Sequence, residues 1–130
     1  MAAFLMTLNK NKHVLIVDDD DVIREYVQEL LLFSNYKVTQ AENGKEGFKQ
    51  VQKNMPDLVI TDIVMPEMEG ISFIRKLRSY NKDMPIVAMT GNIGGRMEEF
   101  LELSSQLGAD EVLRKPIKSQ ELLDVIHNLI

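Results

Sequence analysis

The chain has 130 residues and a formal net charge of −5, so it fits one domain, and its acidic balance argues against a direct nucleic acid partner, which normally needs a basic face. It contains no cysteine, which excludes disulfides and thiol catalysis and fits a reducing cytoplasm. No apolar run approaches the length of a membrane span, so we expect no membrane partner.

Residues 1–11 carry a short apolar patch, but they lack the basic region and the long apolar region of a signal peptide. We expect this segment to be a flexible lead-in. Residues 12–130 show no linker, low-complexity segment or internal repeat, so they are expected to form one domain.

Short apolar runs alternate with amphipathic segments along the rest of the chain. Most of the runs are rich in valine, isoleucine and leucine on successive positions, which is typical of strands covered on both faces. The segments between them carry apolar residues at helical spacing. In chain order, we expect a strand at Val14–Val17, a helix at 21–35, a strand at Lys37–Gln40, a helix at 44–54, a strand at Leu58–Thr61, a helix at 70–80, a strand at Ile86–Met89, a helix at 96–107, a strand at Glu111–Leu113 and a helix at 118–130.

Five strand–helix units in series predict an α/β fold. Short connections and right-handed crossovers favour a doubly wound, five-stranded parallel sheet with helices on both faces. The apolar stripe of the first helix is expected to include Val22, Ile23, Val27, Leu30 and Leu31.

Four consecutive aspartates, 18–21, follow the first strand in "VLIVDDDD". Like charges repel, and a carboxylate near an apolar core costs free energy. Asp20 and Asp21 are interpreted as the turn and cap of the first helix, where acids interact well with the helix dipole and with free N–H groups.

Polar side chains also follow three other strands. Asp62 comes after the third strand, Thr90 after the fourth and Lys115 after the fifth. In an open parallel sheet, ligands bind outside the carboxyl ends of the strands, so these side chains are expected to converge with Asp18 and Asp19.

Converging carboxylates need a cation. With oxygen ligands and no histidine or cysteine nearby, Mg²⁺ is the natural choice. An acidic cluster, a divalent ion, a lysine and a hydroxyl together suit a phosphoryl group, for which one carboxylate can act as the nucleophile.

These residues resemble the receiver domains of two-component response regulators, over about residues 12–130. The acid pair, "TDIVMPEMEG", "MTG" and "RKP" follow strands one, three, four and five in the family's order. Each motif alone is weak, but four in order are highly specific. The resemblance implies a flavodoxin-like (βα)5 fold with strand order 2-1-3-4-5.

The resemblance also implies site roles. Asp62 would accept a phosphoryl group from a phosphohistidine. Asp19 would bind Mg²⁺ directly, with Asp18 acting nearby or through water, and Asp62 and the backbone carbonyl of Val64 would complete the protein ligands.

Further roles fall on the fourth and fifth strands. The Thr90 hydroxyl would bond the phosphoryl group and move when it arrives, and Lys115 would hold a phosphoryl oxygen. Gly91 would leave access to the acceptor. Pro116 fits the family's usual cis Lys–Pro bond.

Two departures from the family concern output. Val112 stands where most receivers carry an aromatic residue that turns inward, and valine is too small and stiff for such a rotamer switch. The stretch from Thr90 to Lys115 is longer than usual and contains Asn92, Gly94 and Gly95. We hypothesise that this loop, permissive because of its glycines, is the mobile output element.

The residues two past the acceptor and the threonine, Val64 and Asn92, tune phosphoryl lifetime in the family. Val64 offers no side-chain hydrogen bond to an attacking water, which predicts a long-lived phosphoaspartate.

The resulting interpretation is a stand-alone phosphoacceptor switch in a histidine–aspartate phosphorelay, rather than a turnover enzyme. Its expected partners are a histidine kinase or histidine phosphotransfer protein and a downstream protein, and it is expected to be a monomer or a phosphorylation-dependent dimer. One alternative is a receiver-like binding module that works without phosphorylation. A second is a Mg²⁺-dependent aspartyl-phosphate phosphatase, for which Asp18 and Asp20 offer an acid pair at the required spacing.

Overall fold

The computed structural model describes residues 12–65, 70–91, 95 and 97–130. The expected flexible lead-in at 1–11 lies outside the described residues, as do Asn92 and Gly94 of the expected output loop.

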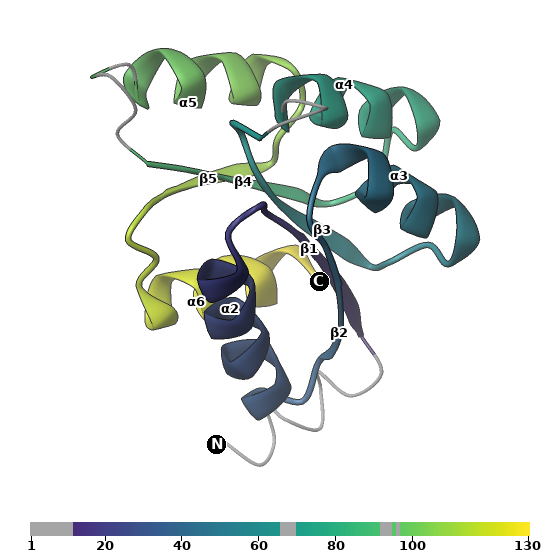
Figure 1. Cartoon of the computed structure of the whole chain (residues 1–130), viewed down its shortest axis with the longest axis vertical. Coiled ribbons are helices and arrows are strands. Elements are labelled where there is room, and N and C mark those ends of the chain that lie inside the picture. The colour runs from purple at the N-terminus through teal and green to yellow at the C-terminus, as the bar shows by residue number, and fades with distance from the viewer. Residues whose placement is uncertain (1–11, 66–69, 92–94, 96) are drawn as a thin grey trace.

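Five parallel strands form one sheet in the order β2-β1-β3-β4-β5, which confirms the expected fold and strand order (Figure 1). Strands β2 to β5 each extend one residue past the expected carboxyl end, so Asp62 and Thr90 are the last residues of their strands. The strands are β1 (His13–Val17), β2 (Lys37–Ala41), β3 (Leu58–Asp62), β4 (Ile86–Thr90) and β5 (Glu111–Arg114).

A helix follows each strand, within a residue or two of the expected bounds. Helices α2 and α6 lie together on one side of the sheet, and α3, α4 and α5 lie on the other (Figure 1). The helices are α2 (Asp21–Phe33), α3 (Gly44–Lys53), α4 (Gly70–Tyr80), α5 (Met97–Gln106) and α6 (Ser119–Leu129).

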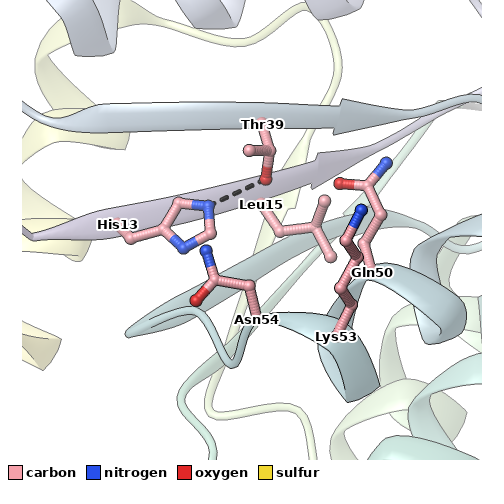
Figure 2. A pocket seen from close by; sticks show the side chains of 6 residues that line it. All are labelled: His13, Leu15, Thr39, Gln50, Lys53 and Asn54. Atoms are coloured by element: carbon pink, nitrogen blue, oxygen red, sulfur yellow. Dashed lines mark hydrogen bonds between the residues drawn. The ribbon is translucent and has the colours of Figure 1, made fainter.

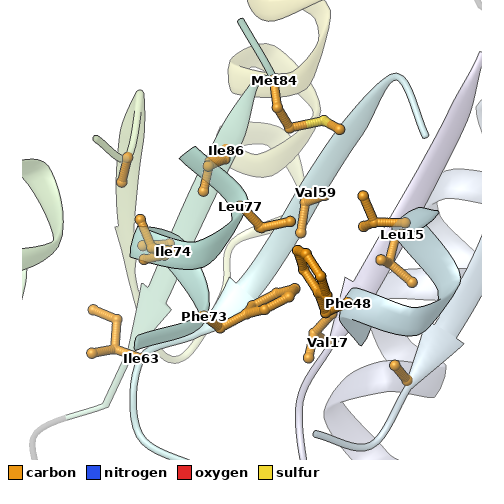
Figure 3. Close-up of a cluster of buried hydrophobic side chains, with 14 of the residues drawn as sticks. Leu15, Val17, Phe48, Val59, Ile63, Phe73, Ile74, Leu77, Met84 and Ile86 are labelled. Carbon is orange, nitrogen blue, oxygen red and sulfur yellow. The ribbon is translucent and has the colours of Figure 1, made fainter. Parts of the chain in front are cut away.

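Alternating side chains of the strands feed two separate apolar layers. In β1, Leu15 and Val17 pack under α3 and α4, while Val14 and Ile16 pack under α2 and α6. Figure 3 shows the first layer, in which Phe48 and Phe73 approach Val17 from neighbouring helices. Burial of both faces explains why the central strands β1, β3 and β4 are mostly apolar on successive residues. The two layers leave the carboxyl edge of the sheet free for polar groups.

The start of α2 corrects one expectation. Val22 is 72% exposed and does not belong to the apolar stripe, whereas Val27 and Leu31 are buried. A helix turns about 100° per residue, so Val22 lies roughly 140° around the axis from Val27. The expected N-cap is present, because the Asp20 carboxylate accepts hydrogen bonds from the backbone N–H groups of Val22 and Ile23.

None of the helices in the described part of the chain combines the length and apolar composition that crossing a membrane requires.

Candidate functional site

Three acids gather at the carboxyl edge of the sheet. Asp18, Asp19 and Asp62 each offer a carboxylate oxygen, and these oxygens lie within 4.8 Å of one another. Asp18 follows β1 and Asp62 ends the neighbouring β3, so parallel pairing of the two strands brings the side chains together. Asp18 is fully buried and Asp62 is 6% exposed, while Asp19 is exposed to solvent. The cluster therefore has a buried base and an open rim.

Lys115 reaches into this cluster from the end of β5. Its Nζ lies 2.9 Å from Asp18 Oδ2 and 3.4 Å from Asp62 Oδ2. Its backbone N–H donates to the Thr90 carbonyl at 2.7 Å, which ties the end of β5 to the end of β4. The Lys115–Pro116 peptide bond is cis. One ammonium group thus faces two carboxylates that come from different strands.

Burial and charge shift the ionisation of these groups. Burial, with the nearby charge of Asp18, raises the pKa of Asp62 to about 6, although Lys115 opposes the shift. Burial also raises the pKa of Asp18, against the hydrogen bond from Lys115. Burial lowers the pKa of Lys115, but its hydrogen bond to Asp18 and the charge of Asp62 outweigh that effect and raise it. The pocket therefore holds more negative charge than one lysine neutralises.

The donor set fits a hard divalent cation. Octahedral Mg²⁺ has oxygen ligands at 2.0–2.1 Å, so neighbouring and opposite ligands lie about 3 to 4 Å apart. The three carboxylate oxygens need only small side-chain movements to reach that spacing from within 4.8 Å. Asp18, Asp19 and Asp62 are the residues that would hold the ion. Val64, whose carbonyl is the fourth predicted ligand, lies half-buried two residues beyond Asp62.

The predicted switch residues line the same edge. Thr90 is fully buried, and its hydroxyl donates to the Gly91 carbonyl at 3.1 Å. A methyl group built on Gly91 would meet no atom of the described residues within 4 Å.

The positions of Val112 and Gly95 do not test their predicted role in output. Val112 is half-buried and packs against the layer under α3 and α4, and a cavity of about 290 Å³ opens between it, Arg114 and Lys118. Gly95 has a φ of 71°, which suits glycine. The roles of Val112 and of the loop in output stay predictions.

Two residues of the site were missed by sequence reasoning. Arg24 of α2 donates from Nη1 to the backbone carbonyl of Asp18 at 2.5 Å. Gly70 begins α4 directly against the backbone of Asp62 and Ile63. A glycine at the expected start of a helix was a signal for close packing, whereas nothing in the sequence pointed to Arg24.

A larger cavity, of about 380 Å³, lies at the opposite edge of the sheet, where β1 begins (Figure 2). There the His13 ring is hydrogen-bonded to the Thr39 hydroxyl at 2.8 Å, and burial lowers the pKa of His13. None of the described residues that line it carries a carboxylate, which distinguishes this cavity from the cluster around Asp62. The residues that line it are His13, Leu15, Thr39, Gln50, Lys53 and Asn54.

Comparisons with known proteins agree with this geometry. A family model described as "Response regulator receiver domain" matches residues 14–127. Response regulator MprA of Mycobacterium sp. (strain KMS) is 37% identical over 110 residues, which cover 85% of this chain and 46% of MprA. MprA of Mycobacterium leprae (strain TN) is 36% identical over 117 residues, covering 90% of this chain and 50% of that protein. The chain spans about half the length of the curated relatives it matches.

Solved structures show the same likeness. A response regulator receiver domain protein from Clostridium thermocellum superimposes with a TM-score of 0.84 at 30% identity, covering 92% of this chain and 94% of that one. Chemotaxis response regulator CheY4 of Vibrio cholerae gives a TM-score of 0.82 at 29% identity, covering 93% and 100%. The sheet order, the acidic pocket and the family match lead to one conclusion: the chain belongs to the response regulator receiver domain family of two-component signalling.

Proposed function

We propose that Asp62 accepts a phosphoryl group from a phosphohistidine, and that the phosphorylated domain signals through an altered protein-binding surface. The observation that carries the proposal is the placement of the Lys115 ammonium between the carboxylates of Asp18 and Asp62. An ammonium so placed can exchange a carboxylate partner for a phosphoryl oxygen once the acceptor carries one.

The transfer is an in-line displacement on phosphorus. An oxygen of the Asp62 carboxylate forms a bond to phosphorus as the bond from phosphorus to the imidazole nitrogen breaks, and the imidazole leaves with that electron pair. The hydrogen bond that Asp62 Oδ1 accepts from the Ile63 N–H, at 2.8 Å, orients the carboxylate. Mg²⁺ bound by Asp18, Asp19 and Asp62 would supply positive charge to the phosphoryl oxygens.

Thr90 and Gly91 have complementary roles in the proposal. The Thr90 hydroxyl, now on the Gly91 carbonyl, lies at the strand end beside the acceptor strand and would turn to a phosphoryl oxygen. Because Gly91 has no side chain, it would leave room for the donor beside the acceptor. The donor would be a histidine kinase or a histidine phosphotransfer protein, as the family implies.

The structure disfavours the phosphatase alternative. That reaction would need Asp20 as a free acid two residues after Asp18, but the Asp20 carboxylate caps α2 through Val22 and Ile23. Receivers are phosphoacceptor switches rather than enzymes that turn over a free substrate.

The test is intact mass after incubation with Mg²⁺ and acetyl phosphate, for the wild type, Asp62→Asn and the exposed control Asp83→Asn. We expect one added phosphoryl group on the wild type and on the control, none on Asp62→Asn, and none with a chelator present. If no adduct forms under any condition, and the fluoride phosphoryl mimic also fails to bind, the phosphorylation-independent binding module becomes the better description.

A further inference from the structure

Each of the three guanidinium nitrogens of Arg24 donates a hydrogen bond to a different segment beside the acidic cluster. Its side chain is 12% exposed. Nη1 donates to the Asp18 carbonyl at 2.5 Å, Nη2 pairs with the Asp21 carboxylate, and Nε donates to Gln40 Oε1 at 2.9 Å. One side chain of α2 therefore ties together the end of β1, the first turn of α2 and the edge strand β2.

These three contacts of Arg24, with Asp18, Asp21 and Gln40, form a clamp, and Gln40 is itself held in place. The Gln40 amide donates from Nε2 to Gln28 Oε1 at 2.7 Å, and the Gln40 carbonyl accepts from the Gln50 side chain of α3 at 2.6 Å. Gln40 is thus fixed from helices on both sides of the sheet. Because a guanidinium is a rigid planar fork, fixing one edge on Gln40 also fixes the direction of the other.

The group that Arg24 holds lies between two candidate metal ligands. The Asp18 carbonyl belongs to the peptide that joins Asp18 to Asp19, so holding it sets the plane of that peptide. Two other backbone contacts hold the turn: the Asp18 N–H donates to the Ala41 carbonyl at 3.2 Å, and the Asp18 carboxylate accepts from the Asp20 N–H at 2.9 Å, which closes the turn around Asp19. The bond from Arg24 differs from these because it acts directly on the peptide group that leads from Asp18 to Asp19.

We propose that Arg24 is a positioning residue that sets the carboxylates of Asp18 and Asp19 in the geometry that binds Mg²⁺. The proposal rests on the proposed function, since it assigns the metal to these acids. Among the described residues, the Arg24 side chain contacts Asp18 at its backbone carbonyl and is hydrogen-bonded to no carboxylate of the cluster. Its charge is matched by Asp21, so its effect on the metal is geometric rather than electrostatic.

The experiment measures the Mg²⁺ dissociation constant by isothermal titration calorimetry for the wild type, Arg24→Met and Arg24→Lys. Removing groups that orient metal ligands commonly weakens binding 10- to 100-fold, and Arg24 acts on the backbone, so we expect a weakening of about tenfold for Arg24→Met. Arg24→Lys keeps the charge but not the fork and should also bind more weakly. In phosphorylation by acetyl phosphate, the Mg²⁺ concentration for half-maximal rate should rise in parallel, while the rate at saturating Mg²⁺ stays close to that of the wild type.

Arg78→Met is the matched control. Arg78 is also mostly buried and donates to backbone carbonyls, those of Gly108 at 2.6 Å and Lys82 at 2.7 Å, but at the far end of α4. It should lose thermal stability as Arg24→Met does, yet keep the wild-type Mg²⁺ affinity. If Arg24→Met does not fold, Gln40→Leu, which removes one anchor of the clamp, should weaken Mg²⁺ binding in the same direction.

The outcomes are separable. Mg²⁺ affinity in Arg24→Met that equals the wild type overturns the positioning role, and tighter binding shows that the charge of Arg24, not its hydrogen bonds, dominates. Equal weakening in Arg78→Met also overturns it, because the effect would then be one of general stability. A wild type that binds no Mg²⁺ contradicts the proposed function itself, and the Arg24 proposal with it.

Discussion

Gly70 packs its backbone directly against the residues that carry the acceptor. A methyl group added there would lie 2.0 Å from the Asp62 carbonyl oxygen and 2.4 Å from Ile63 Cα. Both are backbone atoms of the segment that ends β3, so they cannot move aside without shifting Asp62. We therefore expect Gly70→Ala to lower the free energy of unfolding by about 2–4 kcal/mol, as measured by urea denaturation.

Gly91→Ala is the control for that prediction, since its added methyl group would meet no atom within 4 Å in the part of the chain that the structure describes. Its stability should stay within about 0.5 kcal/mol of the wild type. A Gly70→Ala variant as stable as Gly91→Ala would show that the backbone of Asp62 and Ile63 can move away from residue 70 at no cost. The site would then not depend on a glycine there.

Residues of the site differ in how far the sequence could locate them. Asp18, Asp62 and Lys115 were placed correctly at one edge because each directly follows or ends a strand, and parallel strands align their carboxyl ends. Arg24 could not be found in this way. Its contact with the Asp18 carbonyl depends on the path of the β1–α2 turn, which no periodicity encodes.

At the scale of elements, the four aspartates after β1 have different structural roles. Asp18 and Asp19 join the acidic cluster, Asp20 caps α2, and Asp21 pairs with Arg24. Like charges are tolerated in sequence because the carboxylates of Asp18, Asp20 and Asp21 meet different donors and Asp19 is exposed to solvent. The turn can therefore supply both a cluster of acids and a stable start for the next helix.

The cap makes a distinct prediction for α2. Asp20→Ala removes the hydrogen bonds to the N–H groups of Val22 and Ile23, at 2.9 and 3.4 Å, and leaves them without that acceptor. We expect a loss of about 1 kcal/mol in the free energy of unfolding, measured by chemical denaturation. Asp20→Asn keeps a good cap and should lose only a few tenths of a kcal/mol. Equal losses in the two variants would mean that charge at the helix end, not capping, is what Asp20 contributes.

The positions of the strands and helices along the chain were easier to predict than the side of each helix that packs against the sheet. The central strands β1, β3 and β4 were recognised because both of their faces are buried, which gives apolar runs such as Leu58–Ile60. Val22 was assigned to the wrong face of α2 because it is apolar and adjoins Ile23. Its 72% exposure follows from its position roughly 140° around the helix axis from the buried Val27.

At the scale of the whole molecule, two well-packed apolar layers support an edge where negative charges repel. Among the described residues, the core has no comparable conflict, since its buried side chains are almost all aliphatic or aromatic. The free energy that packing provides is partly offset at the acidic edge. Such an opposition is expected if, as proposed, the site binds a cation and a phosphoryl group, because such a site is not selected for maximal stability.

The pH dependence of stability exposes this cost, because the pKa of Asp62 is raised from 3.8 to about 6 in the folded chain. Between these values the folded state binds more protons than the unfolded state, so stability falls as pH rises through about 6. The shift corresponds to about 3 kcal/mol, and Asp62→Asn, which cannot ionise, should escape that loss. With a chelator present, we compare the free energy of unfolding of Asp62→Asn with that of the wild type. We expect the variant's advantage to be near zero at about pH 4 and to approach about 3 kcal/mol at pH 7 to 8. Urea denaturation across this range measures the gain, and the exposed Asp83→Asn should show none. A gain that does not vary with pH, or a less stable Asp62→Asn at pH 8, would mean that the Asp62 carboxylate costs the metal-free fold nothing.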